Sequence, residues 1–322
     1  MTNIKDIAKL AGVSITTVSR VLNNHPYVSE DKRKRVQQIV EELEYHQNLN
    51  AVNLVKGKTF TVGVILPYLD HPYFQLIVAG IMDSAIAKNY SVLICPTNYS
   101  RSEEIKYLNM LKGRQIDGFI ICSRANHWDV ITPFKEYGPI IACEQTDYIP
   151  CVFTDHYHAF RAGLEYLIKK GHTSIGYSTG RKKSFSSQMR SAAYTDALKK
   201  AGLSFEQSWI FTDCLNMGDG KQLVKKLLHI ENRPTALLVN GDEVAAGMMI
   251  QAKKEGLGIP EELSIVGFDN YPFSEALDLT TIDQNLKEIG KHAFDLFFEG
   301  EDKKISIPFH LIERTTVKTL LC

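Results

Sequence analysis

Residues 59–322 alternate between short apolar runs and longer amphipathic stretches, and this alternation restricts the fold more than any other feature. The apolar runs have the length of buried β-strands and cover residues 62–66, 92–95, 119–122, 140–143, 152–154, 175–178, 210–212, 236–239 and 265–268. Helical stretches separate the later runs, at residues 188–201, 220–229 and 243–255. The pattern predicts parallel sheets with helices on both faces, in two α/β subdomains, with ligands bound at the carboxyl ends of the strands.

The first 46 residues show a different pattern, in which apolar residues recur three and four positions apart. The first such stretch, residues 4–11, ends at Gly12. Ser14 can cap a second helix and Ser29 a third, each through its hydroxyl. The side chains expected to form a shared core are Ile4, Ile7, Ala8, Ala11, Val18, Val21, Leu22, Val36, Ile39, Val40 and Leu43. The sequence therefore predicts three short helices around one small core.

Charge is unevenly distributed, although 37 Lys and Arg residues balance 37 Asp and Glu residues overall. Residues 1–58 hold nine basic and six acidic side chains, a net charge of +3, which leaves −3 for the rest. A small basic segment joined to a slightly acidic body fits a nucleic-acid-binding module. Neither a signal segment nor a membrane-length apolar run occurs, so we expect a cytoplasmic protein. Six cysteines without a C-x-x-C pair predict neither a disulfide framework nor a zinc ribbon.

The most specific motif is the helix-turn-helix of residues 4–23, IKDIAKLAGVSITTVSRVLN. It closely resembles the amino terminus of the lactose-repressor/galactose-repressor (LacI/GalR) family of bacterial transcription regulators. Further similarity lies at residues 27–29, 59–66, 171–172, 267–270 and 312–314. The resemblance implies binding to pseudo-palindromic operator DNA as a homodimer. It also implies a helix-turn-helix headpiece, a hinge helix with its linker, and a periplasmic-binding-protein-like body of two doubly wound α/β subdomains with an effector cleft, at residues 1–46, 47–58 and 59–322.

The resemblance places the base-reading positions of the second helix at Ile15, Thr16 and Arg20. A guanidinium can donate two hydrogen bonds to guanine, whereas Ile15 offers only an apolar contact, for instance to a thymine methyl group. Hydroxyls and amides near a helix start suit phosphate contacts. The predicted phosphate donors are Ser14, Thr17 and Ser19, and Asn23 is a further predicted DNA contact. The alternative is that these polar residues are ordinary solvated helix positions.

The same resemblance identifies residues 48–54 as the hinge helix, with Ala51 and Leu54 in contact with DNA. Leu54 is the expected apolar wedge that opens a central base step, at an unstacking cost of roughly a few kcal/mol. Two positions depart from the family pattern, because Gln47 replaces a proline and Asn53 an often basic residue. We therefore expect weaker DNA affinity than a more basic hinge provides. The alternative is that Leu54 merely packs within a linker.

The body residues that the resemblance places in the effector cleft are Tyr73, Phe74, Glu144, Arg190, Asp242 and Asp269. A guanidinium and a carboxylate can each bind two hydroxyls while an aromatic ring covers an apolar face, which suits a sugar or another polyol. The alternative for each charged residue is a structural role as a helix cap or an ion-pair partner. This alternative applies above all to Asp242, which stands at an expected helix start.

Two patterns imitate catalytic or metal sites. Residues 176–180 spell G-x-S-x-G, and Asp269 and His292 complete a hydrolase order, but the polar stretch after the serine lacks the helix that a nucleophile elbow requires. Residues 155–158 read Asp-His-Tyr-His, yet the two histidines would point to different sides of a helix start. Neither a P-loop nor a dinucleotide-binding fingerprint occurs. We therefore predict a protein that is not an enzyme and needs neither a cofactor nor a metal.

Together these features predict a sequence-specific transcriptional repressor whose operator affinity is controlled by a small, sugar-like effector. The chain lacks the leucine heptad tail of tetrameric relatives, so we expect a homodimer. The first alternative is a cytoplasmic sugar-binding protein without a regulatory role, which a DNA-binding measurement would separate. The second is a serine hydrolase, which intact activity of a Ser178→Ala variant would remove.

Overall fold

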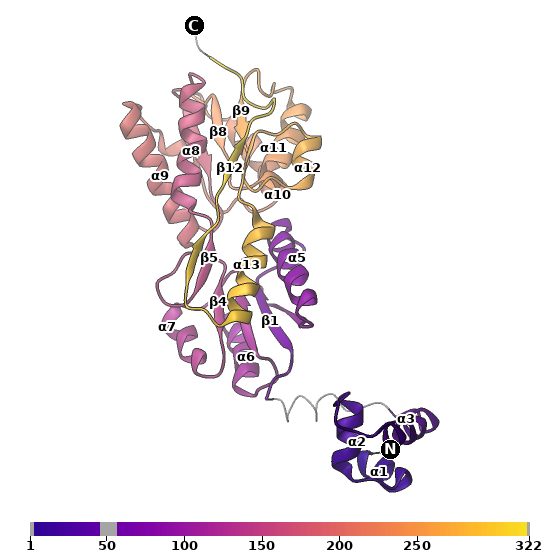
Figure 1. The fold of residues 1–322 in the computed structure, drawn as a ribbon. Coiled ribbons are helices and arrows are strands. Elements are labelled where there is room, and N and C mark those ends of the chain that lie inside the picture. The colour runs from indigo at the N-terminus through magenta and orange to yellow at the C-terminus, as the bar shows by residue number, and fades with distance from the viewer. Residues whose placement is uncertain (1–2, 46–56, 321–322) are drawn as a thin grey trace. The chain divides into compact units, whose positions relative to one another are not determined.

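The computed structural model describes residues 3–45 and 57–320, and the chain forms two compact units, residues 1–59 and 60–322. The smaller unit, the headpiece, contains α1 (Ile4–Ala11), α2 (Ile15–Leu22) and α3 (Glu30–Glu42) (Figure 1). The predicted small core is confirmed, and its buried members are Ile7, Ala8, Ala11, Val18, Val21 and Val36. Leu43, expected in that core, is instead 37% exposed, because it lies just beyond the last turn of α3.

Capping residues account for where the headpiece helices α1 and α2 begin and where α1 ends. Asn3 caps α1 and forms a reciprocal capping box with Asp6, and Gly12 ends α1 in the left-handed conformation, at a φ of 63°. The Ser14 hydroxyl accepts the Thr17 backbone N–H over 3.1 Å, as predicted for the start of α2. Ser29 does occupy the cap position of α3, but its hydroxyl makes no capping hydrogen bond.

The first subdomain of the body is built on a six-stranded parallel sheet with the order β11-β5-β4-β3-β1-β2. Its strands are β1 (Thr61–Leu66), β2 (Ser91–Pro96), β3 (Gly118–Ile121), β4 (Ile140–Ala142), β5 (Cys151–Phe153) and β11 (Lys304–Ser306). One face packs against α5 (Pro72–Ala87) and α13 (Leu286–Glu299). The other face packs against α6 (Arg101–Lys112) and α7 (Trp128–Ile131), which precedes a 3-10 helix (Thr132–Glu136).

The second subdomain contains a four-stranded parallel sheet with the order β7-β6-β8-β9. Its strands are β6 (Ile175–Ser178), β7 (Ile210–Phe211), β8 (Ala236–Leu238) and β9 (Ser264–Val266). Buried side chains of α8 (His156–Lys169) and α9 (Phe185–Ala201) cover one face, and those of α10 (Met217–Leu228) and α11 (Asp242–Glu255) cover the other. A 3-10 helix (Gln207–Trp209) precedes β7, and α12 (Pro272–Ala276) follows β9.

Three segments cross between the subdomains, so that each subdomain is discontinuous in sequence. The first segment follows β5. The second follows β10 (Thr281–Asp283), and the third follows β11 and leads into β12 (His310–Ile312). β10 and β12 pair antiparallel. All nine predicted strands are present, whereas β10, β11 and β12 were not predicted, because each contains only one or two apolar residues. The predicted division into two α/β subdomains with parallel sheets is confirmed.

One glycine pair brings two helices unusually close in each subdomain. A methyl group on Gly80 of α5 would overlap the carbonyl oxygen of Lys287, and one on Gly290 of α13 would overlap that of Ile77. The corresponding glycines of α10 and α11 are Gly220 and Gly247. These contacts fix α13 against α5, although the two helices are about 200 residues apart in the chain. Within the described residues, no helix combines the length and the apolar character needed to cross a membrane.

Candidate functional site

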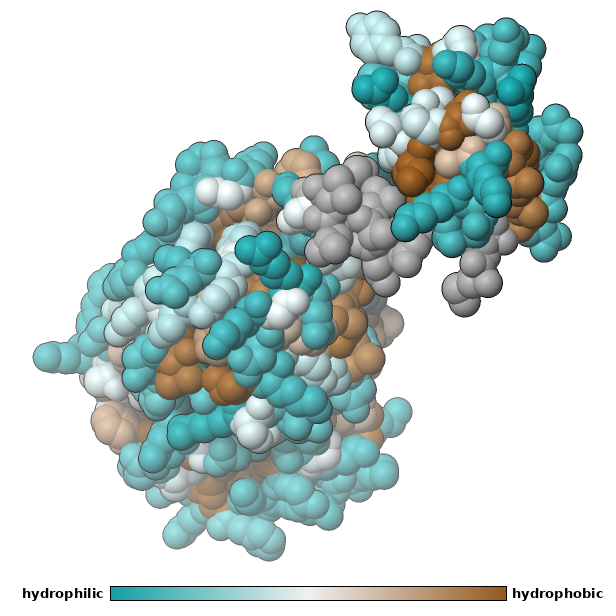
Figure 2. Space-filling view, turned by 90° about the horizontal axis from the view of Figure 1, so that it is seen from below, coloured by the Kyte–Doolittle hydropathy of each residue, from teal (hydrophilic) through white to brown (hydrophobic). Residues whose placement is uncertain are grey.

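The headpiece presents one face of α2 to solvent. Val18 and Val21 of this helix are buried in the core, while Thr16 and Arg20 are exposed and Ile15 is 45% exposed. Apolar side chains reach the surface of the headpiece, where they give brown areas among the hydrophilic ones in Figure 2. The three residues expected to read bases are therefore available to an external partner.

Arg20 differs from its neighbours because nothing in the described part of the chain accepts a hydrogen bond or an ion pair from its guanidinium. The hydroxyls of Ser14 and Thr17 lie 2.9 Å apart, so one of their two protons remains free for an outside acceptor. The Asn23 amide donates to the Ser19 carbonyl over 2.8 Å and so closes the end of α2. The predicted contacts Ala51 and Leu54, with the rest of residues 48–54, lie outside the described residues. The domain limits at 46 and 58 also stay predictions.

In the body, a cavity of about 140 Å³ lies between the two subdomains at the carboxyl ends of their strands. Five of the six predicted effector residues line it, from α5, the end of β4, α9 and the segment after β9: Tyr73, Phe74, Glu144, Arg190 and Asp269. The structure thus brings together residues that are up to 196 positions apart, at the place that the strand topology predicts.

Asp242 is the exception, since the residues that line the cavity in the described chain do not include it. Its side chain is fully buried at the start of α11, and it accepts hydrogen bonds from the Ser274 hydroxyl (2.5 Å), the Thr281 hydroxyl (2.6 Å) and the Tyr271 backbone N–H (3.0 Å). The structure therefore gives Asp242 the structural role that we considered as the alternative: it ties α12 and β10 to the start of α11.

Asp269 is a buried carboxyl group that lines the cavity. It accepts hydrogen bonds from the Tyr271 hydroxyl (2.6 Å) and from the Gln284 amide. Burial, aided by the nearby charge of Asp242, raises the pKa of Asp269 to about 8. The group is therefore mostly protonated at neutral pH, and it can donate a hydrogen bond as well as accept one.

Arg190 lies beside Asp269 and is only 5% exposed. Its Nη1 donates to the carbonyl and the side-chain oxygen of Asn240, over 2.9 and 2.6 Å, and its guanidinium carbon lies 4.1 Å from the centre of the Phe268 ring. Its Nε is buried without a hydrogen-bond partner in the described structure, as is Nδ1 of His156, which also lines the cavity. A ligand that enters this cavity would find a fixed guanidinium beside a neutral carboxyl group.

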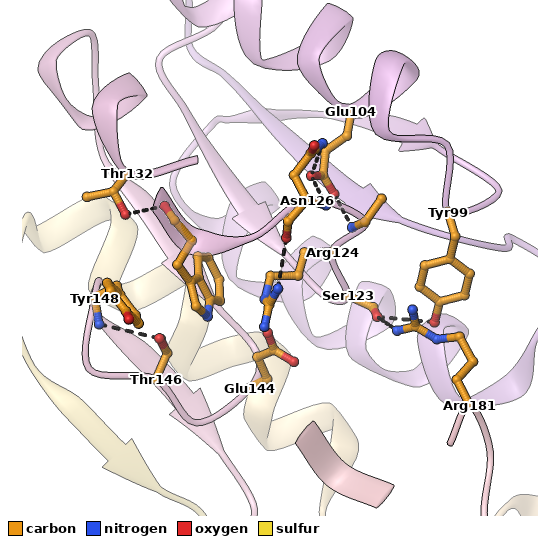
Figure 3. Close-up of polar contacts among 12 residues, drawn as sticks. Tyr99, Glu104, Ser123, Arg124, Asn126, Thr132, Glu144, Thr146, Tyr148 and Arg181 are labelled. Carbon is orange, nitrogen blue, oxygen red and sulfur yellow. Dashed lines mark hydrogen bonds and ion pairs between the residues drawn. The ribbon is translucent and has the colours of Figure 1, made fainter. Parts of the chain in front are cut away.

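Several lining residues, among them Tyr99, Ser123 and Arg181, were missed by the sequence analysis. Figure 3 shows Arg181, from the second subdomain, against Tyr99 and Ser123 of the first. The guanidinium carbon of Arg181 lies 3.5 Å from the centre of the Tyr99 ring, and the Tyr99 hydroxyl lies 3.2 Å from that of Ser123. His71 Nε2 also spans the cleft, 3.2 Å from the Leu215 carbonyl. Tyr99, Ser123 and Arg181 all follow strand ends, a signal that could have identified them.

A buried carboxylate fixes the loop that carries Ser123. The fully buried Glu104 of α6 accepts the backbone N–H groups of Ala125 and Asn126, over 2.6 and 2.9 Å (Figure 3). This anchor places Arg124 so that its Nε lies 2.6 Å from a carboxylate oxygen of Glu144. The Glu144 charge is therefore already paired at the cavity wall.

The two segments that resemble a hydrolase motif and a metal site, residues 176–180 and 155–158, have structural roles. Ser178 is fully buried and its hydroxyl accepts the Asn240 backbone N–H over 2.9 Å, while the next helix begins only at Phe185, so no nucleophile elbow forms. Asp155 caps α8 by accepting the His158 backbone N–H over 3.0 Å. His156, in contrast, packs against the Phe268 ring, with the ring centres 6.4 Å apart.

Comparison with known proteins identifies both units. Residues 3–48 match the model of bacterial regulatory proteins of the lacI family, and residues 59–315 match that of periplasmic binding proteins and the sugar-binding domain of the LacI family. The transcriptional regulator YkvZ of Bacillus subtilis is 44% identical over 98% of this chain and the whole of that protein. Catabolite control protein B of the same organism is 44% identical over 95% of this chain and 97% of its own length.

A solved structure extends the similarity to the whole fold. The lac repressor dimer bound to operator and the anti-inducer ONPF is 26% identical, with a TM-score of 0.87, and the match covers 98% of this chain and 99% of that one. These matches confirm the resemblance inferred from residues 4–23, and the matched relatives are regulators of transcription, not enzymes. The chain therefore belongs to the LacI family of bacterial regulatory proteins, with a helix-turn-helix headpiece and a periplasmic-binding-protein-like body.

Proposed function

We propose that this protein is a homodimeric transcriptional repressor that binds a pseudo-palindromic operator through its headpieces and releases or tightens that grip when a sugar-like effector enters the body cavity. The observation that carries the proposal is the exposed face of α2, where Arg20 has no partner among the described residues. A free guanidinium on the second helix of such a motif suits bidentate recognition of guanine. We also place the protein in the bacterial cytoplasm, at the nucleoid when operator-bound.

The body supports the effector part of this proposal. Arg190 and Asp269 offer fixed donors and acceptors for hydroxyl groups, and the aromatic rings of Tyr73, Phe74 and Tyr99 line the same cavity. Apolar residues of α5 are exposed, with Met82 at 43% and Ile86 at 67%, and they supply a surface that a second copy can cover. The lac repressor, which shares the fold, is a dimer on operator DNA.

The test is selection of bound duplexes from a random DNA pool with the full-length chain. We expect a recovered site with two inverted half-sites, protected by one dimer. An Arg20→Ala variant should recover a degraded site or none. Recovery of no preferred sequence, by a protein that still binds sugars, would support a plain sugar-binding protein and contradict the proposal.

A further inference from the structure

Two guanidinium groups, those of Arg181 and Arg190, line the cavity between the subdomains. Neither has a carboxylate oxygen within ion-pair distance anywhere in residues 3–45 or 57–320. The nearest interactions of Arg181 are the Tyr99 ring and the Ser123 hydroxyl at 3.5 Å, which is too long for a strong hydrogen bond. Arg190 is buried and Arg181 half-buried, and a buried cation without an ion-pair partner is costly, so this arrangement favours an anion in the cavity.

The two acidic residues that line the cavity do not supply that anion. Glu144 is committed to Arg124, with Nε and carboxylate oxygen 2.6 Å apart. Asp269 is held by the Tyr271 hydroxyl and the Gln284 amide, and burial raises its pKa to about 8, so it is largely neutral at pH 7. The lining therefore has a net positive charge.

A third donor group faces the same cavity. Ser184, Phe185 and Ser186, the cap and first residues of the 17-residue helix α9, line it next to Arg181. The first turn of α9 contains no acidic residue, and the backbone N–H groups of Phe185 and Ser186 have no acceptor within the described residues. The positive end of a helix dipole with free N–H groups is a good phosphate site, and the adjacent guanidinium strengthens it.

We propose that the effector is a phosphorylated sugar, an inference that rests on the proposed function. Its phosphate is held by Arg181 and the start of α9, and its hydroxyls by Arg190 and Asp269. The buried Nε of Arg190 has no hydrogen-bond acceptor in the described residues, and this is an independent indication that a ligand supplies one. The Tyr99 ring stacks on the Arg181 guanidinium and fixes its plane. Because Tyr99 and Ser123 belong to the first subdomain, a phosphate bound there would also join the two subdomains.

The experiment is titration of the full-length protein by calorimetry with inorganic phosphate, D-glucose 6-phosphate and D-glucose, at constant ionic strength set by chloride. We expect inorganic phosphate to bind, and Arg181→Gln to weaken it about tenfold or more. Ser186→Asp should abolish phosphate binding while keeping or raising the melting temperature, because an acidic residue stabilises a helix start. Lys182→Gln is the matched control: it removes the same charge from an exposed neighbour and should leave the affinity unchanged.

Absence of phosphate binding to the native protein would overturn the inference, as would equal binding by native protein and the Ser186→Asp variant. Tighter binding of D-glucose than of its phosphate would do the same. These failures are distinct from failure of the proposed function, which is read from operator selection without any ligand. A protein that selects an operator and ignores phosphate keeps its regulatory function and loses only the phosphorylated effector.

Discussion

Asp242 and Asp269 are bound to the same residue, Tyr271, which donates its backbone N–H to Asp242 and its hydroxyl to Asp269. Asp242 is close enough for its negative charge to disfavour the ionised form of Asp269. Burial is the larger influence on both, and it raises the pKa of Asp242 to about 6 and that of Asp269 to about 8. One carboxyl group supports the subdomain and the other faces the cavity, so substitutions at the two positions should have different consequences.

The raised pKa of Asp269 should make stability fall as the pH rises from about 4 to about 8, and the fall should level off above that. The unfolded chain loses this proton near pH 3.8, whereas the folded chain keeps it until about pH 8, so folding binds a proton across that interval. The buried His71, His156 and His172 have lowered pKa values, so they bind protons mainly in the unfolded chain, and their opposing effect on stability fades as the pH rises above 7. We expect the melting temperature to fall between pH 7 and pH 8.5, and Asp269→Asn to flatten this slope.

The control for that series is Asp213→Asn, an exposed carboxyl group in the same subdomain, which should leave the slope unchanged. Equal slopes in the native protein and the Asp269→Asn variant would show that Asp269 is ionised at neutral pH. The same variant should also lose the response to the effector, since a cavity contact is altered.

Asp242→Ala should destabilise the fold rather than weaken ligand contacts. It leaves the Ser274 hydroxyl, the Thr281 hydroxyl and the Tyr271 N–H without their acceptor, at a loss of about 3 kcal/mol or more in the free energy of unfolding. Urea denaturation measures this loss, and Asp242→Asn, which keeps one acceptor oxygen, should lose less. If the Asp242→Ala protein is stable but no longer binds effector, Asp242 contacts the ligand and its structural role is contradicted.

Gly290→Ala should be destabilising even though alanine is the better helix former. An exposed glycine-to-alanine change in a helix gains up to about 1 kcal/mol. Here the added methyl group would overlap the Ile77 carbonyl oxygen, and overpacking of this kind costs about 1–3 kcal/mol. Thermal unfolding should show the lower stability, while Glu299→Ala, at an exposed position of the same helix, should stay within about 0.5 kcal/mol of the native protein. A stabilised Gly290→Ala protein would mean that α5 and α13 can separate without loss.

The elements that the sequence predicted well are those fixed by local pattern. The strand of residues 62–66 and the helices of the headpiece follow from apolar spacing and from caps such as Ser14. The lysine, isoleucine and serine of β11 have no such pattern, because the strand forms only by adding to β5 at the edge of the sheet. Its position is decided by tertiary pairing.

The cavity shows the same distinction. Asp242 and Asp269 both follow apolar runs, so the sequence alone could not show which of the two faces the effector. What separates them is direction: Asp242 points back into the protein toward Ser274 and Thr281, and Asp269 lines the cavity. Arg181 looked like part of a polar loop, and its place against Tyr99 depends on how the two subdomains meet.

Arg20→Lys should remove base discrimination while keeping the attraction to DNA. Lysine retains the positive charge but not the planar pair of donors that fits guanine, so preference at one base pair of the selected operator should fall by about 1–3 kcal/mol. The salt dependence of binding should change little, because it reports phosphate neutralisation. Binding to a set of single-base operator variants at two salt concentrations measures both quantities. Arg33→Lys is the control, since the Arg33 guanidinium donates to the His25 carbonyl over 2.6 Å within the headpiece. A uniform loss across all operator variants would make Arg20 a phosphate contact, and the reading of guanine would then have to come from another residue of α2.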